Sequence, residues 1–177
     1  MHKLTLISRQ IVLGLAVTTM LTGCSISVNS GGSKQAGSPD AGGVFRSTNR
    51  GDSWSVASNI PTATGRPSSI STLNSNALAI DPSDHRALYF ASSDSGLAYS
   101  YDGAQNWQIA TSLGKIGVSA VAVDYRDKCT VFAATTNRLM RSTDCSRTWT
   151  QVYYDNDPKV VITSLLVDHH NANFVYL

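Results

Sequence analysis

Short apolar segments alternate with polar turns along the chain from residue 43 onward. Several of these segments end in an aspartate, and a pair of large apolar residues follows seven residues later. The first pattern occurs as Leu78-Ala79-Ile80-Asp81, Val121-Ala122-Val123-Asp124 and Leu165-Leu166-Val167-Asp168, and the second as Leu88-Tyr89, Val131-Phe132 and Val175-Tyr176. Short runs rich in Val, Ile, Tyr and Phe between turn residues are typical of β-strands.

These patterns predict an all-β chain. After the first 23 residues, no stretch long enough to form a helix has apolar residues at helical spacing. We expect a strand pair first, then two sets of four strands, then a second pair. The expected strands are residues 44–48 and 53–57; 77–81, 87–92, 97–101 and 106–110; 118–124, 130–135, 138–143 and 148–153; and 160–167 and 173–177.

An eight-residue motif recurs in phase with these strands. Its frame is Ser-x-Asp/Asn-x-small-x-Ser/Thr/Asn-Trp, its spacings are 53 and 42 residues, and its last position holds all three tryptophans of the chain. Serine and aspartate side chains bond to nearby backbone N–H groups in tight turns, and a tryptophan adds a large apolar surface. We interpret the motif as structural; its key residues are Ser47, Asn49, Gly51, Trp54, Ser100, Asp102, Trp107, Ser142, Asp144 and Trp149.

The motif resembles the Asp-box, or bacterial neuraminidase, repeat Ser-x-Asp-x-Gly-x-Thr-Trp. Similar repeats build β-propellers in sialidases, sortilin-type receptors, xyloglucan-degrading glycosidases and photosystem II stability-assembly factors. The resemblance implies a β-propeller, with each motif joining the third and fourth strands of a blade and its tryptophan in the core. No copy is perfect: the departures are Asn49, Ala104, Asn106 and Ser146.

The strand count predicts an incomplete arc of two full blades and two half blades. Propellers need roughly four or more blades to close. We therefore expect residues 43–177 to be the front part of a longer propeller. The alternative is a three-blade chain that dimerises.

The amino terminus is typical of an exported lipoprotein. Lys3 and Arg9 precede the apolar segment 11–21, which is too short to span a bilayer and suits a secretory signal. Leu21-Thr22-Gly23-Cys24 resembles a bacterial lipobox, which implies lipidation at Cys24. We expect a signal peptide over 1–23, a flexible Ser/Gly-rich tether over 24–42, and attachment to the cell envelope, at the outer membrane in a Gram-negative cell. The alternative is an ordinary secretory signal with a chance cysteine.

Charge and composition limit the classes of partner that the chain is expected to bind. The chain contains no Glu, which suits strands and turns better than helices. Removing Lys3 and Arg9 from the 14 basic residues leaves 12, equal to the 12 acidic residues. Because the sequence has no basic stripe, we expect no nucleic-acid partner. We also expect no cofactor.

Cys129 and Cys145 would lie close together if strand 130–135 pairs with the strand that follows a turn at 136–137. A disulfide there would stabilise the hairpin by roughly 3 kcal/mol. The alternative is two free thiols. Two cysteines alone do not supply a zinc site, so we expect no metal.

Candidate catalytic chemistry is sparse. A sialidase requires a glutamate, which is absent, and Gly65-Arg66-Pro67 resembles the Arg-Ile-Pro motif only weakly. The segment 88–99 resembles xyloglucanases and would place a catalytic carboxylate at Asp94. Such a carboxylate needs a partner, which would lie on an absent blade. The alternative is that Asp94 is a turn residue in Ser-Asp-Ser-Gly, which is the interpretation we favour.

Two further segments are candidates by position. His169-His170 lies in an expected loop, where a solvated pair is favoured over a metal site. The inter-repeat segment 58–76 is about ten residues longer than its counterparts, and extra propeller loops often bind ligands. Two classes of function stay open: a non-catalytic binding or assembly module for a protein or glycan, and the N-terminal part of a xyloglucanase-like or sialidase-like glycoside hydrolase.

The lipobox yields a direct prediction. The mature protein should partition with membranes and incorporate labelled palmitate, and Cys24→Ser should abolish the label, because that thiol is the expected acceptor. Recovery of the wild type as a soluble protein with an unmodified amino terminus would contradict the assignment.

Overall fold

The computed structural model describes residues 42–66 and 68–177. The expected signal and nearly all of the expected tether lie outside these residues. Within them, every strand pairing is antiparallel, and the single helical element is a 3-10 turn, η1 (Ile70–Thr72). No helix in the described residues is long and apolar enough to cross a membrane.

Two complete four-stranded sheets form the middle of the fold, as the sequence predicts. One follows chain order through β5 (Ser75–Ile80), β6 (Leu88–Ser92), β7 (Leu97–Ser100) and β8 (Gln108–Ile109). The other contains β9 (Ala120–Val123), β10 (Val131–Thr135), β11 (Arg138–Ser142) and β12 (Thr150–Tyr154). We call them blades two and three.

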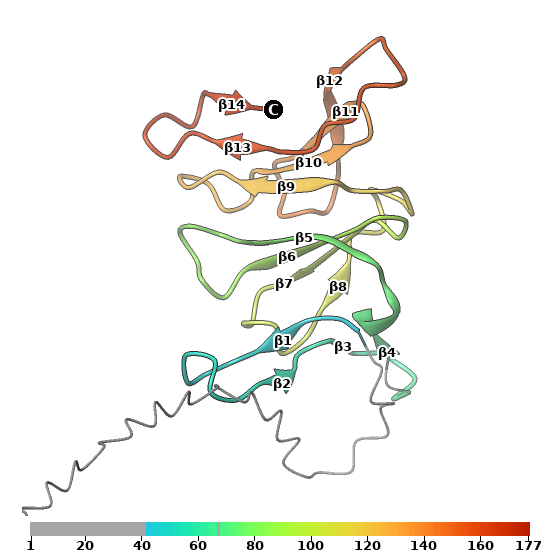
Figure 1. The fold of residues 1–177 in the computed structure, drawn as a ribbon, viewed down its shortest axis with the longest axis vertical. Coiled ribbons are helices and arrows are strands. Elements are labelled where there is room, and N and C mark those ends of the chain that lie inside the picture. The colour runs from blue at the N-terminus through green and yellow to red at the C-terminus, as the bar shows by residue number, and fades with distance from the viewer. Residues whose placement is uncertain (1–41, 67) are drawn as a thin grey trace, which may run out of the picture.

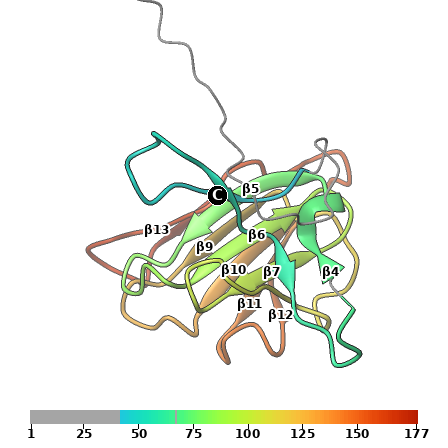
Figure 2. The same ribbon diagram turned by 90° about the horizontal axis from the view of Figure 1, so that it is seen from below.

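A two-stranded sheet lies at each end of this pair. Blade one has β1 (Phe45–Arg46) and β2 (Ser55–Val56), and blade four has β13 (Leu166–Val167) and β14 (Val175–Tyr176). Figure 1 shows the sheets stacked in chain order, with β1–β2 at one end and β13–β14 at the other. Seen along the stack, β5, β9 and β13 lie on one side and β12 lies on the other (Figure 2). The described strands form the predicted open arc of a β-propeller.

Two segments differ from the predicted elements. The long inter-repeat segment contains a hairpin of β3 (Asn59–Ile60) and β4 (Ser68–Ser69), followed by η1. The expected strand 160–167 shortens to β13, because its middle is held elsewhere: the Ile162 amide donates to the Thr136 carbonyl at 2.8 Å. That bond fastens the segment to the β10–β11 turn instead of a neighbouring strand.

Apolar residues between adjacent blades form three cores. The largest lies between blades two and three and includes Tyr89, Leu97, Val118 and Val131, each with no exposed surface. A second core joins blades one and two around Trp107, and a third joins blades three and four around Ala134. Each complete blade therefore buries side chains on both faces.

The recurring motif forms one turn geometry three times; we call residues 47–54, 100–107 and 142–149 the serine–tryptophan turns. In the second turn the Ser100 hydroxyl accepts from the Ala104 amide at 3.0 Å, and the Asp102 carboxylate accepts from the Asn106 amide at 2.9 Å. The first and third turns repeat both bonds with the pairs Ser47–Gly51, Asn49–Ser53, Ser142–Ser146 and Asp144–Thr148.

The fifth position of each turn is left-handed. Gly51 has φ 99°, Ala104 has φ 65° and Ser146 has φ 66°. A left-handed residue with a Cβ costs roughly 1–2 kcal/mol, so the side-chain hydrogen bonds hold Ala104 and Ser146 in a conformation that glycine would adopt more easily.

The three tryptophans have different surroundings. Trp107 is fully buried, and its Nε1 donates to the Ala57 carbonyl of blade one at 2.7 Å. Trp149 is half-buried against the core between blades two and three. Trp54 does not reach a core and is 49% exposed, because no described blade precedes the β1–β2 hairpin.

Trp107→Ala should destabilise the fold by roughly 3–5 kcal/mol in urea denaturation, since it leaves a large cavity between blades one and two. Trp107→Phe should cost less, because it keeps an aromatic ring while removing the indole N–H. Equal losses for the two variants would mean that the hydrogen bond to Ala57, and not the packing, dominates.

Candidate functional site

Asp94 lies in the turn between β6 and β7. Its Oδ1 accepts from the Ser95 hydroxyl at 2.7 Å and the Ser92 hydroxyl at 3.1 Å, and its Oδ2 accepts from the Asn74 amide at 3.0 Å. These bonds, with Ser95 the largest contributor, lower the pKa of the Asp94 carboxyl. An ionised carboxylate suits a general base and not a general acid.

The Asp94 turn is held in place by the connection between blades two and three. Gly96 has φ 86°, and its amide donates to the Ile116 carbonyl at 2.9 Å. A Cβ at Gly96 would collide with the Gly114 carbonyl oxygen, so glycine is required there. The turn is therefore fixed in position, as the turn-residue interpretation of Asp94 implies.

The long segment between blades one and two reaches the same face. Asn74, near the end of this segment, is the residue whose amide holds Asp94. The segment is anchored by Ile70, which has no exposed surface and whose amide donates to the Ser58 carbonyl at 2.9 Å. The structure thus brings together two candidates that the sequence identified separately.

A shallow hollow of about 250 Å³, largely open to solvent, lies at the tip of the β3–β4 hairpin. Its lining combines polar and apolar groups with one cation: Asn59, Ile60, Pro61, Thr62, Gly65 and Arg66. Arg66 belongs to the Gly-Arg-Pro segment; its carbonyl accepts from the Thr62 hydroxyl, and Pro67 lies outside the described residues. The hollow can accept hydrogen-bonding or anionic groups.

The strand-end aspartates close turns between first and second strands. Asp81 is fully buried, and its Oδ1 accepts from the Ser83 amide at 2.7 Å. Asp124 accepts from the Arg126 amide at 2.8 Å. Asp168 accepts from the His170 amide at 2.7 Å, and this bond is the largest cause that lowers the pKa of the Asp168 carboxyl.

The neighbouring histidines are exposed. The His169 ring stacks on Tyr125, with centroids 6.3 Å apart. Across residues 42–66 and 68–177, no group of three or more potential metal-binding side chains is found.

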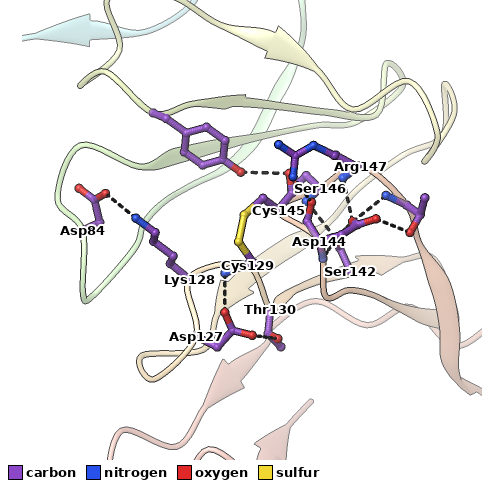
Figure 3. The surroundings of a disulfide bond; sticks show 12 residues. Asp84, Asp127, Lys128, Cys129, Thr130, Ser142, Asp144, Cys145, Ser146 and Arg147 are labelled. Carbon is purple, nitrogen blue, oxygen red and sulfur yellow. Dashed lines mark hydrogen bonds and ion pairs between the residues drawn. A yellow bond between two sulfur atoms is a disulfide. The ribbon is translucent and has the colours of Figure 1, made fainter.

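A disulfide joins Cys129, just before β10, to Cys145 in the third serine–tryptophan turn (Figure 3). Their Cα atoms are 3.9 Å apart, below the range of about 4.4–6.8 Å usual for disulfides. The Cys145 amide donates to the Cys129 carbonyl at 3.1 Å. The pairing that brings the cysteines together is Val131 with Ser142, across the expected turn at 136–137.

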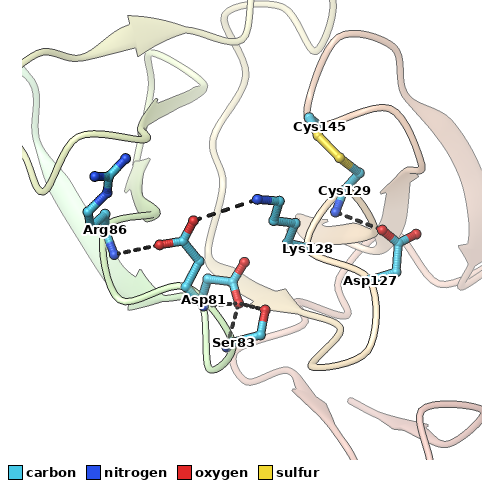
Figure 4. Close-up of polar contacts among 8 residues, drawn as sticks. Asp81, Ser83, Arg86, Asp127, Lys128, Cys129 and Cys145 are labelled. Carbon is cyan, nitrogen blue, oxygen red and sulfur yellow. Dashed lines mark hydrogen bonds and ion pairs between the residues drawn. A yellow bond between two sulfur atoms is a disulfide. The ribbon is translucent and has the colours of Figure 1, made fainter.

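The disulfide lies beside contacts between blades two and three. The Tyr101 hydroxyl donates to the Cys145 carbonyl at 3.2 Å. Lys128 lies 3.7 Å from Asp84 of the β5–β6 turn (Figure 3), the turn that also contains Asp81 and Ser83 (Figure 4). The Lys128 side chain is 62% exposed, so solvent screens this ion pair and the tyrosine bond is the firmer contact.

The interface between blades two and three buries several polar atoms whose lack of a partner the sequence does not indicate. Tyr89 Oη, Ser146 Oγ and Trp149 Nε1 are buried without a hydrogen-bond partner. Burial raises the pKa of Tyr89 far above its ordinary value. No sequence signal marks Tyr89, because its equivalent in blade three, Phe132, is apolar. Buried groups of this kind are commonly satisfied by internal water.

Cys24, the expected lipidation site, lies outside the described residues.

No family model matches the chain, and no curated protein matches it.

Several solved structures share the fold. An ancestral GH74 enzyme matches with a TM-score of 0.60 and 19% identity over 77% of this chain and 19% of that chain. A GH74 enzyme from Niastella koreensis matches with a TM-score of 0.51 and 21% identity over 72% of this chain and 20% of that chain. An extracellular domain ascribed to a hybrid two component system of B. thetaiotaomicron matches with a TM-score of 0.51 and 13% identity over 73% and 17%.

These likenesses support the β-propeller fold and, at such identities, the fold alone. The chain spans about a fifth of the length of each of these structures.

The Asp94 contacts generate a prediction about titration. Asn74→Ala removes one donor, so the pKa of Asp94 should rise toward its ordinary value of 3.8. Because the folded-state pKa is lowered, this carboxylate contributes stability above its unfolded pKa, and that contribution is lost as pH falls through the folded pKa. The variant should therefore lose stability above the unfolded pKa, and its stability should depend less on pH in the acid range.

Side-chain ¹³C shifts across an acid titration measure this change. The pKa of Asp102, which is also lowered but by bonds within its own turn, should not move and serves as the internal control. An unchanged Asp94 would show that Asn74 does not hold the carboxylate.

Proposed function

We propose that this chain is a membrane-anchored extracytoplasmic β-propeller that binds a protein or a glycan and is not catalytic by itself. Lipidation at Cys24 of Leu21-Thr22-Gly23-Cys24 would provide the anchor, and the Ser/Gly-rich segment after it would hold the propeller away from the membrane. The proposed location is the bacterial cell envelope, at the outer membrane in a Gram-negative cell.

The hollow at the β3–β4 hairpin is the observation that carries the binding proposal. It is built by a hairpin that has no counterpart between blades two and three, so the propeller fold alone does not require it. Its polar lining and Arg66 suit a ligand with hydroxyl or acidic groups, and binding functions on rigid scaffolds concentrate in such loops.

A glycoside hydrolase of the xyloglucanase-like or sialidase-like type is the second candidate. Two observations favour it: the fold likeness to GH74 enzymes, and the lowered pKa of Asp94. Against it, the direct hydrogen-bond partners of the Asp94 side chain are Asn74, Ser92 and Ser95, and none is an acid. Hydrolysis needs a second carboxylate on the same face.

Binding to a glycan array that includes xyloglucan oligosaccharides, and to envelope proteins in cross-linking, tests the two candidates together. We expect binding to weaken at least about tenfold in Thr62→Ala/Arg66→Ala, because the hollow loses its cation and a hydroxyl. Asp94→Ala serves as the matched control and should bind like the wild type.

Release of reducing ends from xyloglucan would be measured to test the glycoside hydrolase candidate. We expect none from this chain. Release that Asp94→Ala abolishes would establish the hydrolase and overturn the non-catalytic proposal. Binding that survives in the hollow variant would remove the hollow from the site.

A further inference from the structure

The interface between blades two and three buries four polar side-chain atoms that have no hydrogen-bond partner among the described residues. They are Asp81 Oδ2, Tyr89 Oη, Ser146 Oγ and Trp149 Nε1. The side chains of Asp81, Tyr89 and Ser146 are at most 2% exposed. Burial of such atoms is unfavourable unless they are hydrogen-bonded, so this group of four requires a physical explanation.

Asp81 and Tyr89 face blade three from blade two. Tyr89 pairs with Ala79 in the β5–β6 register, and both residues pack in the core between the two blades. Asp81 lies two residues beyond Ala79, and residues two apart along a strand face the same side of the sheet. Burial is the main cause that raises the pKa of Tyr89, and after Tyr101 the negative charge of Asp81 adds to it, which places the two groups close together.

Tyr101 connects these groups to the third serine–tryptophan turn. Its ring meets the Tyr89 ring edge-on, with centroids 6.3 Å apart, and its hydroxyl donates to the Cys145 carbonyl at 3.2 Å. Ser146 follows Cys145 in the chain (Figure 3), and Trp149, at the end of the same turn, packs against the same core. The four atoms therefore belong to one region of the interface.

The indole of Trp149 lacks the acceptor that satisfies Trp107. The Trp107 Nε1 donates to the carbonyl of Ala57, at the end of blade one. Ala110 occupies the same repeat position in blade two, and its carbonyl accepts from the Leu113 amide at 3.0 Å, because the connection to blade three turns at that point. The Trp149 N–H is thus buried where the carbonyl of the preceding blade is already engaged.

Both buried hydroxyls occur at positions where another repeat has an apolar side chain. The counterpart of Ser146 in the second serine–tryptophan turn is Ala104, and the counterpart of Tyr89 in blade three is Phe132; both are buried. The fold therefore does not require a hydroxyl at either position. The two hydroxyls occur together at the interface in which the indole N–H also lacks a carbonyl.

We propose that this interface is a specific binding site for internal water, which bridges the carboxylate of Asp81, the two hydroxyls and the indole N–H of Trp149. A carboxylate oxygen only accepts hydrogen bonds and an indole N–H only donates them, so the occupant must do both. The Asp81 charge repels an anion, and a cation cannot accept from Trp149. A buried water makes roughly three hydrogen bonds, so four atoms suit about one or two molecules. The site lies inside the fold and does not depend on the proposed ligand.

Cross-relaxation between water and the indole N–H groups tests the site directly in the full chain, kept in detergent. We expect the Trp149 Nε1–H to show a cross peak to long-lived water in ¹⁵N-edited NOESY and ROESY spectra. The Trp107 Nε1–H is the internal control and should show none, because it donates to the Ala57 carbonyl. A Trp149 indole without a water cross peak would overturn the proposal.

Urea denaturation of Tyr89→Phe and Ser146→Ala gives a second readout, whose sign depends on the water. If water bonds these hydroxyls, each variant should raise the equilibrium constant for unfolding at least about threefold. If they have no partner, each variant removes an unpaired buried hydroxyl and should lower that constant. Tyr99→Phe is the matched control: Tyr99 packs against the same core, but its hydroxyl donates to the exposed Gln108, so the constant should change less than about twofold.

The double variant Tyr89→Phe/Ser146→Ala tests whether the hydroxyls share their water. Loss of the shared water in either single variant removes part of what the second change would cost, so the combined effect should be smaller than the product of the two single effects. Effects that multiply independently, or single variants that lower the unfolding constant, would overturn the proposal.

Discussion

Coverage of both faces of each sheet is the constraint on which this fold depends. A four-stranded antiparallel sheet with apolar residues on both sides is stable only between two neighbours. Blade two meets this condition through Phe90 and Trp107 on one side and Tyr89 and Leu97 on the other. Among the described residues, blades one and four each have a neighbouring blade on one side only.

The serine–tryptophan turns make this packing possible by closing on their own side chains. Ser100 and Asp102 satisfy the turn amides locally, so the turn needs no help from a neighbouring blade to keep its shape. The tryptophan that follows can then be directed outward to the preceding blade. The third turn adds a covalent constraint, since Cys145 is bonded to Cys129 just before β10.

Much of this arrangement could be predicted from sequence, because it repeats. The aspartates at 81, 124 and 168 and the three tryptophans mark the same positions in each repeat, which places the strands and the Val131–Ser142 register. The β3–β4 hairpin could not be predicted in this way because it occurs once. The Asn74–Asp94 contact also escaped prediction, since it joins residues 20 apart through a fold-dependent meeting of two loops. The burial of Tyr89 depends on what blade three places opposite it.

The bond from the Trp107 indole to the Ala57 carbonyl gives the stack a direction. Blade two contributes this indole to blade one, and Trp149 of blade three likewise packs against the core shared with blade two although its Nε1 has no hydrogen-bond partner among the described residues, so the two faces of a blade are not interchangeable. Gene duplication can therefore lengthen such a chain by whole repeats, because each inserted repeat packs its tryptophan against the blade before it and offers the same face to the tryptophan after it. Inserting half a repeat would leave a sheet face without a neighbouring blade to cover it and would destabilise the fold.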